Sequence, residues 1–456
     1  MRKRVRVTVS LAAACTLLGG MALTAVMSAG PALADYAPGP NDIVGGGSDT
    51  LQYMVDFAAD GDVDGDAGYN DLGGAYKLVS MDATADANAR FSWAVGASLS
   101  NPTAGALNPT AVYRGGTYPQ LRINGSGAGI NALLADTSAA DPTINFARMS
   151  SNPTASEGAV AQTNGWDGLQ DFVLGTENLR IAADLTTNAP CGSTGTCSGS
   201  TIPGISAKQL GLIYEANTPN CLTWADLYST ADGGSGTVPA GVSNDVIIPI
   251  IPQPGSGTRS TFLADLGAAL GLGTGVSVTP GSCTTIGEEN DPTAITSLSS
   301  TTTNPIITTD TCSPNCAADA IEPFSGARLD LYSGLSGNTT FGSNPGQANA
   351  YFRNPAIAYP NTSASVLTPG IEQLTGTGPD GTASYTDTRN LNIVYRWTDQ
   401  ISTTPWQPGG SLNWAETLFC DPGGPTPFFQ TAAGKTLLAE AGANPASQSC
   451  LTSPLN

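Results

Sequence analysis

The 456-residue chain contains no histidine. A Ser-His-Asp or Cys-His hydrolase takes its general base from histidine, so neither arrangement can be assembled from this sequence. The segment at 255–258 (GSGT) is not a nucleophile elbow either, because that motif places a central serine in the order G-x-S-x-G. We therefore predict a protein that is not an enzyme.

Charged residues are scarce, at 12% of the chain, and Asp and Glu outnumber Lys and Arg by 37 to 17. The resulting formal net charge of −20 repels nucleic acid and anionic lipid, so a nucleic-acid partner is not expected. Apolar residues make up 40% of the chain, which argues against disorder. The composition is typical of a folded, loop-rich extracellular protein.

Long hydrophobic runs are confined to the N-terminus. A basic segment at 1–6 (MRKRVR) precedes an apolar stretch at 7–27, and Ala32-Leu33-Ala34 forms a small-residue cleavage site. This order predicts a signal peptide of residues 1–34, cleaved after Ala34. A lipoprotein alternative would modify Cys15 and cut the apolar stretch in half. We expect a secreted or wall-associated protein that is not embedded in a membrane.

Eight cysteines follow the predicted cleavage site, and an even number in an exported chain predicts disulfides. Short spacing favours the pairs Cys191–Cys197 and Cys312–Cys316, and Cys420–Cys450 would fasten the C-terminus. A zinc site would need reduced thiolates, and it usually includes histidines, so structural bridges are the preferred interpretation.

Strand-like and helix-like segments alternate along the chain, which favours an α/β architecture. Strands are expected at 76–81, 120–123, 143–147, 245–251 and 387–397, and the segment at 169–183 is expected to form one or two strands that bridge the lobes. Helices are expected at 49–59, from 130 onward, at 206–214, at 259–270 and at 431–441. Residues 271–344 are rich in Thr, Ser, Asn and Gly and are interpreted as a loop region pinned by disulfides.

Three times, a short strand runs into a Gly/Ser/Thr turn that leads into a helix. The turns are GGGSDT at 45–50, NGSGAG at 124–129 and GSGT at 255–258. Glycines let the backbone approach a ligand closely, and the first turn of a helix offers free N–H groups and a positive dipole end to an anion. Helix capping alone explains one such turn. Three of them in one α/β chain suggest a shared anion site at the carboxyl ends of the strands.

At these segments the chain resembles the phosphate-type periplasmic binding proteins of ABC transporters, including the DING phosphate-binding proteins. The resemblance rests on DIVGGGSDT, NGSGAGI, INFARMSS, SAKQLGLIYEANTPNCLTWADL and PQPGSGTRSTF over residues 42–265, with a looser echo in DAIEPFSGAR. It implies an α/β, two-lobed type II (Venus-flytrap) fold with disulfide-pinned loop insertions. Lobe 1 would comprise 36–175 and 386–456, lobe 2 would comprise 176–385, and the two crossings would form a hinge.

The resemblance also implies a set of phosphate-binding residues. They are Ser48, Asp49 and Thr50 in the first turn, Ser126 and Gly127 in the second, and Ser256, Gly257 and Thr258 in the third. Two positions depart from the family pattern. Ser150 stands where an aspartate is usual, and no arginine precedes the GSGT segment, where Pro252, Gln253 and Pro254 occur instead.

Nearby residues are candidates to replace the missing groups. Arg148 or Arg259 would supply the guanidinium that pairs with an oxyanion. Phosphate keeps a proton near neutral pH and sulfate does not, so a buried carboxylate that accepts a bond from P–OH discriminates between them. Asp49 is the candidate acceptor. The alternatives are a helix cap for Asp49, a structural ion pair for Arg148 and a surface position for Arg259.

A second motif lies at 60–71 (DGDVDGDAGYND), with Asp at positions 1, 3 and 5, Gly at 6 and Asp at 12 of the loop. This is the ligand pattern of an EF-hand, with Asp in place of the final Glu. The candidate ligands of a structural calcium ion are Asp60, Asp62, Asp64, Asp66 and Asp71. A solvated Asp/Gly turn is the alternative, and no other cofactor is expected.

Together these observations predict an exported solute-binding protein that captures phosphate or a similar small oxyanion between two lobes. An ABC permease would then be its partner. The alternative is a secreted surface or adhesive protein that keeps the fold without binding phosphate, which the substitution at Ser150 and the loop insertions favour.

Overall fold

The structure is a computed structural model. It describes residues 38–61, 66–73, 76–83, 110–137, 142–195, 197, 202–231, 234–298, 316–333, 370–401, 413–421 and 425–456. The predicted signal peptide, residues 1–34, lies outside these residues. Among the described helices, none is long and apolar enough to cross a membrane.

A mixed ten-stranded sheet runs through the molecule in the order β2-β1-β5-β11-β6-β9-β7-β8, and β10 and β12 also pair with β6. Its strands are β1 (Ile43–Gly47), β2 (Leu78–Ser80), β5 (Phe146–Met149), β6 (Leu169–Asp184), β7 (Ile248–Pro252), β8 (Thr285–Gly287), β9 (Ala320–Ser325), β10 (Ile371–Gln373), β11 (Asp387–Arg396) and β12 (Ser449–Cys450). β1 is parallel to β2 and β5, and β7 is parallel to β8 and β9, whereas β11 is antiparallel to β5 and β6. A separate pair is formed by β3 (Thr110–Ala111) and β4 (Gln120–Leu121).

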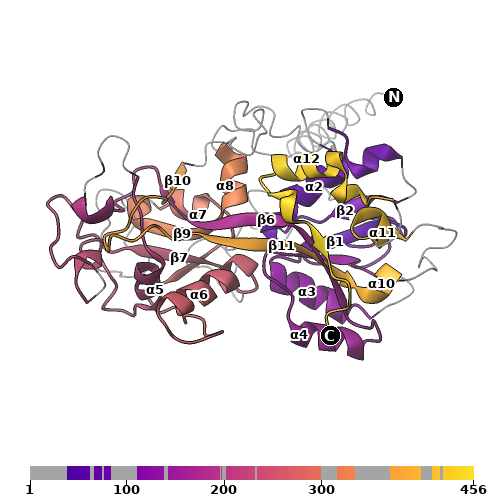
Figure 1. Ribbon diagram of the computed structural model, residues 1–456, viewed down its shortest axis with the longest axis horizontal. Coiled ribbons are helices and arrows are strands. Elements are labelled where there is room, and N and C mark those ends of the chain that lie inside the picture. The colour runs from indigo at the N-terminus through magenta and orange to yellow at the C-terminus, as the bar shows by residue number, and fades with distance from the viewer. Residues whose placement is uncertain are drawn as a thin grey trace, which may run out of the picture.

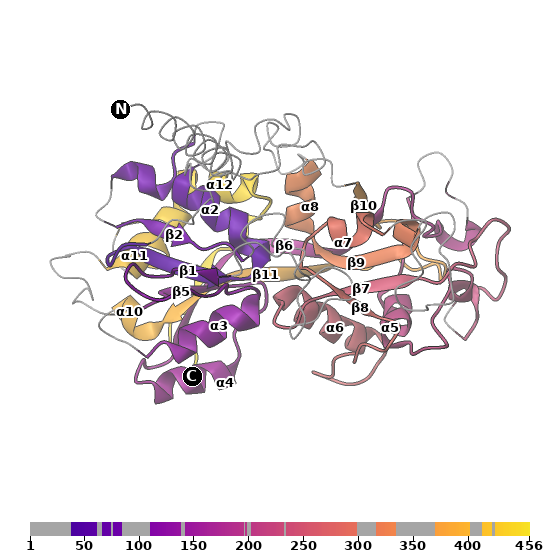
Figure 2. The same ribbon diagram turned by 180° about the vertical axis from the view of Figure 1, so that it is seen from behind.

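Helices cover both faces of the sheet. They are α2 (Gln52–Asp60), α3 (Ser126–Ala135), α4 (Ala155–Thr163), α5 (Ala207–Glu215), α6 (Gly257–Ala269), α7 (Thr293–Thr296), α8 (Gly326–Ser333), α10 (Trp397–Ile401), α11 (Trp414–Leu418) and α12 (Ala432–Glu440). In Figures 1 and 2, α2, α12, α7 and α8 lie above the sheet, and α3, α4, α5 and α6 lie below it.

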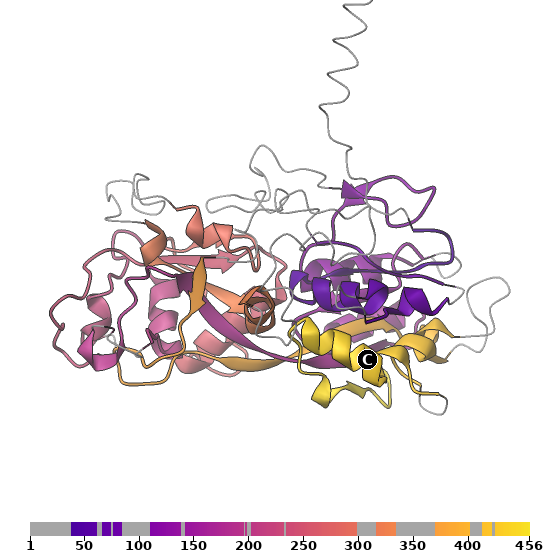
Figure 3. The same cartoon turned by 90° about the horizontal axis from the view of Figure 1, so that it is seen from above.

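The molecule has two lobes, which β6 and β11 connect (Figures 1 and 3). We call the half with β1, β2, β5, α3 and the C-terminal helices lobe 1, and the half with β7, β8, β9, α5 and α6 lobe 2. The 16-residue strand β6 pairs with β11 along most of its length, and its last residues pair with β9 and β10. The predicted lobe boundaries fall within β6 and just before β11.

Alternation of apolar residues along these strands builds separate cores on the two faces. On the upper face, one cluster continues through both lobes and includes Phe57 of α2, Phe172 of β6 and Ile250 of β7. On the lower face, the lobes have separate clusters: Ile130 of α3 belongs to one, and Phe262 of α6 belongs to the other. The lower face is therefore the side on which the apolar core is interrupted between the lobes.

The predicted α/β, two-lobed architecture is confirmed, with differences at the ends of elements. α3 begins at Ser126, although the apolar pattern predicts a helix only from Ile130. The first helical turn is glycine-rich, so it carries no apolar periodicity even though it is helical. The strand predicted at 143–147 lies at Phe146–Met149, and the segment at 169–183 forms one strand and not two.

Three disulfides join described cysteines: Cys191–Cys197, Cys221–Cys283 and Cys420–Cys450. The predicted pairs Cys191–Cys197 and Cys420–Cys450 are confirmed. Cys316 is also disulfide-bonded, whereas its predicted partner Cys312 lies outside the described residues.

Candidate functional site

The three Gly/Ser/Thr turns each join a strand or bridge to a helical turn. Ser48 follows β1 and precedes the short 3₁₀ helix η1 (Asp49–Leu51). Gly125 precedes α3 with a φ of 103°, a backbone conformation that favours glycine. Ser256 caps α6, because its Oγ accepts a hydrogen bond from the N–H of Arg259 at 3.1 Å. The local sequence thus accounts for each turn separately.

The fold brings the second and third turns into direct contact across the two lobes. The N–H of Gly127 donates to the carbonyl of Gly255 at 2.9 Å. A Cβ added at Gly257 would lie 2.2 Å from Ser126 Oγ and 2.5 Å from Ser150 Oγ. Only glycine fits at this position, so the N-termini of α3 and α6 open toward the same small region.

A cluster of buried hydroxyl groups occupies that region. Ser48 Oγ donates to Ser150 Oγ at 2.9 Å, and Ser126 Oγ lies 3.3 Å from the same atom. Ser126 Oγ also accepts from the N–H of Ser150 at 2.9 Å. Each of these three serines is at most 2% exposed. Ser150, which departs from the family pattern, therefore lies at the centre of the predicted site, and we call these residues the serine cluster.

A second polar group, the threonine network, continues from the serine cluster between the lobes. Thr50 Oγ1 lies 3.5 Å from Thr258 Oγ1, so the first and third turns also meet. Both hydroxyls donate to Glu289 Oε1, at 3.2 Å from Thr50 and 2.5 Å from Thr258. Arg389 Nη2 donates to Thr258 Oγ1 at 2.8 Å. A guanidinium from the connecting strand β11 thus reaches the helix terminus of lobe 2.

Glu177 on β6 holds Arg389 in place. Its Oε1 accepts from Arg389 Nε at 2.8 Å and from Arg389 Nη2. Its Oε2 accepts from the N–H of Ala327 at 3.0 Å and from the hydroxyl of Ser325. Arg389 is 6% exposed, and its Nη1 has no hydrogen-bond partner within the described part of the chain. Glu177 thus orients the guanidinium whose Nη2 contacts Thr258.

Asp49 lies in the same region but faces an arginine of lobe 2. Arg328 Nη2 is 2.8 Å from each carboxylate oxygen of Asp49, and both residues are fully buried. Asn290 Nδ2 adds a hydrogen bond to Asp49 Oδ2 at 3.3 Å. The guanidinium of Arg328 also stacks on the ring of Tyr53, 3.9 Å from its centroid. Asp49 thus takes part in a buried ion pair between the lobes.

The two arginines that the sequence proposes as oxyanion partners point elsewhere. Arg148 is fully buried, and its guanidinium donates to Ser80 Oγ and, at 2.8 Å, to the carbonyl of Met81. Burial lowers its pKa, and the charge of nearby Asp56 raises it. Arg259 Nη1 donates to the carbonyl of Pro252 at 2.9 Å. These contacts are hydrogen bonds to a hydroxyl and to backbone carbonyls, and neither places a guanidinium on the serine cluster.

Buried acids give the region an unusual electrostatic character. Burial raises the pKa of Glu289, the charge of Asp49 raises it further, and the hydrogen bond from Thr258 lowers it. Glu322 on β9 is fully buried, and desolvation raises its pKa well above the ordinary value, with the charges of Asp291, Glu288 and Glu289 adding to the effect. The carboxyls near the threonine network therefore hold protons more readily than carboxyls in water.

The predicted calcium loop is only partly described. Asp62 and Asp64 lie outside the described residues. Asp60 Oδ1 accepts from Asn70 Nδ2 at 2.8 Å, and Asp71 Oδ2 accepts from the N–H of Gly68 at 3.3 Å. Asp66 is exposed. Among the described residues, no group of three or more His, Cys, Asp or Glu side chains is arranged to hold a metal. Calcium binding stays a prediction.

Comparisons with known proteins give matches among solved structures alone. No protein-family model matches the chain, and no curated protein matches it. An ABC-type phosphate transport receptor from Vibrio cholerae is 13% identical, with 88% of this chain and 99% of that chain covered and a TM-score of 0.40. A putative phosphate ABC transporter substrate-binding protein from Clostridium perfringens, with bound phosphate, is 11% identical, with coverages of 89% and 99% and a TM-score of 0.41. A DING protein is 14% identical, with coverages of 89% and 91% and a TM-score of 0.38. Each of these is a protein to which the chain is similar over most of its length.

Proposed function

We propose that the chain is an exported solute-binding protein that captures phosphate, or a similar small oxyanion, between its two lobes. The observation that carries the proposal is the meeting of three Gly/Ser/Thr turns at one place. Ser48, Ser126 and Ser150 lie within hydrogen-bonding distance of one another or of a shared partner, and Gly257 packs against them. Turns from lobe 1 and lobe 2 both contribute.

The donor set suits a tetrahedral oxyanion. Hydroxyl groups are donors, and the dipoles of α3 and α6 add positive potential at their N-terminal ends. Of the first-turn N–H groups, those of Gly127 and Arg259 already bond Gly255 O and Ser256 Oγ. Arg389 brings a guanidinium to Thr258, and a charge-assisted hydrogen bond is about twice as strong as a neutral one. We infer that Arg389 supplies the cation that the sequence places at Arg148 or Arg259.

The connecting strands give this site a way to open. β6 and β11 join the lobes, and the lower-face cores of the lobes are separate. A hinge at these strands would separate the turns of lobe 1 from those of lobe 2 and admit the anion. The proposal also includes export of the chain, with cleavage of the signal peptide after Ala34. The exported protein would deliver its bound anion to an ABC permease.

Isothermal titration calorimetry with phosphate, sulfate and arsenate tests the proposal. We expect phosphate binding at micromolar or lower concentration. Thr258→Val should weaken phosphate binding about 10- to 100-fold, because a hydrogen bond to a charged group contributes about 1.5–3 kcal/mol. Thr163→Val is the matched control, since its exposed hydroxyl bonds the carbonyl of Ala159 in α4.

Three outcomes would contradict the proposal or redirect it. Absence of heat with all three anions would favour the surface-protein alternative. Equal affinities of the Thr258→Val and Thr163→Val variants for phosphate would place the anion elsewhere. Turnover of an aryl phosphate would indicate a hydrolase that works without histidine.

A further inference from the structure

Glu289 occupies a position that an anion oxygen would need. It follows β8 in lobe 2 and is fully buried. Its Oε1 accepts hydrogen bonds from Thr50 of the first turn and Thr258 of the third. Its N–H donates to Gln253 Oε1 at 2.8 Å, which fixes the loop against the end of β7. A carboxylate of the protein is therefore bound by hydroxyls of the proposed anion site.

Counting protons shows that this carboxylate competes with an anion. A threonine hydroxyl has a single proton to donate. Thr258 Oγ1 accepts from Arg389 Nη2, so its own proton goes to Glu289. Thr50 Oγ1 accepts from Asn290 Nδ2 at 3.2 Å and likewise donates to Glu289. While Glu289 is ionised, both hydroxyl protons are taken, and its negative charge repels an oxyanion nearby.

The charged surroundings favour protonation of Glu289 when an anion arrives. Two negative groups act on it from other elements: Asp49 on η1 raises its pKa, and Glu322 on β9 interacts with it, while Glu288 and Asp291 on its own loop act on Glu322. Arg389 on β11 is the facing cation, and Arg328 on α8 pairs with Asp49. Burial already raises the pKa of Glu289. A bound oxyanion adds negative charge and raises it again.

We propose that binding of an oxyanion is coupled to the uptake of one proton by Glu289. The inference rests on the proposed function and names a regulation of that site. The proton comes from solvent, and the neutral carboxyl then donates a hydrogen bond to the anion. The hydroxyl protons of Thr50 and Thr258 become available to the anion at the same time.

The coupling makes affinity depend on pH. Between the pKa of Glu289 in the ligand-free protein and its higher pKa in the complex, affinity falls about tenfold for each unit of rising pH. Phosphate itself also changes protonation near neutral pH, so wild type alone does not isolate Glu289. The difference between wild type and Glu289→Gln does isolate it, because the ionisation of phosphate is common to both.

The experiment is calorimetric titration with phosphate in buffers of different ionisation enthalpy, which counts protons taken up per anion bound. Wild type should take up more protons than Glu289→Gln, by up to one per anion, and its affinity should fall more steeply with pH. Glu215→Gln is the matched control, since Glu215 is exposed at the end of α5, and it should behave as wild type.

The outcomes separate this inference from the proposed function. Phosphate binding with equal proton counts in wild type and Glu289→Gln overturns the coupling and leaves the binding function in place. No phosphate binding by wild type overturns both. If Glu289→Gln does not fold, infrared difference spectra of wild type decide the question. A new protonated-carboxyl stretch on addition of phosphate supports the coupling, and its absence overturns it.

Discussion

Two regions of this molecule are stabilised by different kinds of buried contact. Where the Gly/Ser/Thr turns of the two lobes meet, buried contacts are polar: serine and threonine hydroxyls, the Asp49–Arg328 pair and the Glu177–Arg389 pair. Beneath the C-terminal segment of lobe 1, buried contacts are aromatic, and a disulfide closes them. Phe419 lies at the centre of this aromatic region, with ring centroids of neighbouring aromatic residues 5.1–6.2 Å away.

The difference between the two regions indicates which contacts a change in pH or an added anion can alter. Apolar packing depends little on pH or on an anion, so the contacts between the aromatic rings respond to neither. Hydrogen bonds and charges between the lobes can be exchanged for a ligand or for water with a small net change in free energy. The polar region is therefore the place where a bound anion, if the proposed function holds, would act on the contacts between the lobes.

The largest expected effect is on the aromatic region. Phe419→Ala removes a fully buried ring that contacts five others, and we expect the free energy of unfolding to fall by about 4 kcal/mol. Tyr118→Ala is the control, because that ring is 89% exposed, and it should change stability by less than about 0.5 kcal/mol. Chemical denaturation monitored by fluorescence measures both. A loss below about 1 kcal/mol for Phe419→Ala would mean that the aromatic contacts are not those described.

Arg328→Met should have the next largest effect, because it leaves the carboxylate of Asp49 buried without its cation. We expect a loss of about 3 kcal/mol in the free energy of unfolding at pH 7. The double variant Asp49→Leu/Arg328→Met should lose less than Arg328→Met alone, because no isolated charge remains. Additive losses in a double-mutant cycle would contradict a direct ion pair between the lobes.

The difference between local and long-range contacts also determines which of these residues could be predicted from the sequence. The three turns were found from sequence because their Gly, Ser and Thr residues act locally, at the start of helices. The sequence does not predict that Arg328, Arg389 and Glu289 lie beside residues of these turns. Arg328 meets Asp49 across 279 positions, and Arg389 meets Thr258 across 131. Arg389 lies in a predicted strand and Arg328 in the quoted segment DAIEPFSGAR, but no local pattern shows which partner a strand arginine will face.

The location of Glu289 beside the turns could not be predicted from the sequence either. Glu289 follows a short strand in a Thr-rich segment, where a pair of adjacent acidic residues indicates a solvated loop. Only parallel pairing of β8 with β7 brings it beside the turn before α6. The sequence favours Arg148 because it lies two residues before Ser150 at the end of a strand, but its side chain extends to Ser80 and Met81. Proximity in sequence did not determine direction.

The effect of each disulfide on stability should depend on the length of the loop that it closes. Replacing Cys420 and Cys450 with serine opens a loop of separation 30 and should lower the free energy of unfolding by about 2 kcal/mol. Replacing Cys191 and Cys197, with separation 6, should cost less, because a short loop loses less chain entropy when it is closed. Thermal unfolding of the two double variants makes the comparison. Phosphate affinity should stay unchanged in both, since neither bridge contributes to the serine cluster or the threonine network.

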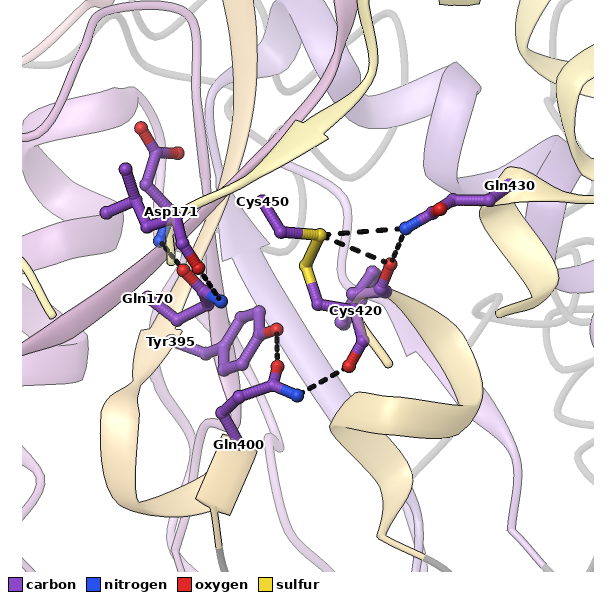
Figure 4. The surroundings of a disulfide bond; sticks show 9 residues. Gln170, Asp171, Tyr395, Gln400, Cys420, Gln430 and Cys450 are labelled. Atoms are coloured by element: carbon purple, nitrogen blue, oxygen red, sulfur yellow. Dashed lines mark hydrogen bonds between the residues drawn. A yellow bond between two sulfur atoms is a disulfide. The ribbon is translucent and has the colours of Figure 1, made fainter. Parts of the chain in front are cut away.

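The smallest predicted effect concerns Asp171 of β6, which Figure 4 shows near the Cys420–Cys450 disulfide together with the polar side chains of Gln170, Gln400 and Gln430. Burial raises its pKa to about 7, and its Oδ1 has no hydrogen-bond partner among the residues that the structure describes. Because the folded-state pKa lies above the unfolded value, ionisation favours the unfolded chain, and stability falls as pH rises from about 4 to about 7.

Asp171→Asn removes that penalty. The variant should be more stable than wild type by about 1 kcal/mol at pH 8, and the difference should disappear at pH 4, where the carboxyl is protonated in the folded protein. Denaturation curves at the two pH values measure the difference, and pH 4 serves as the internal control. Equal stabilities at pH 8 would mean that water reaches the Asp171 carboxylate. The aromatic side chains of lobe 1 would then exclude water less completely than the polar side chains between the lobes do.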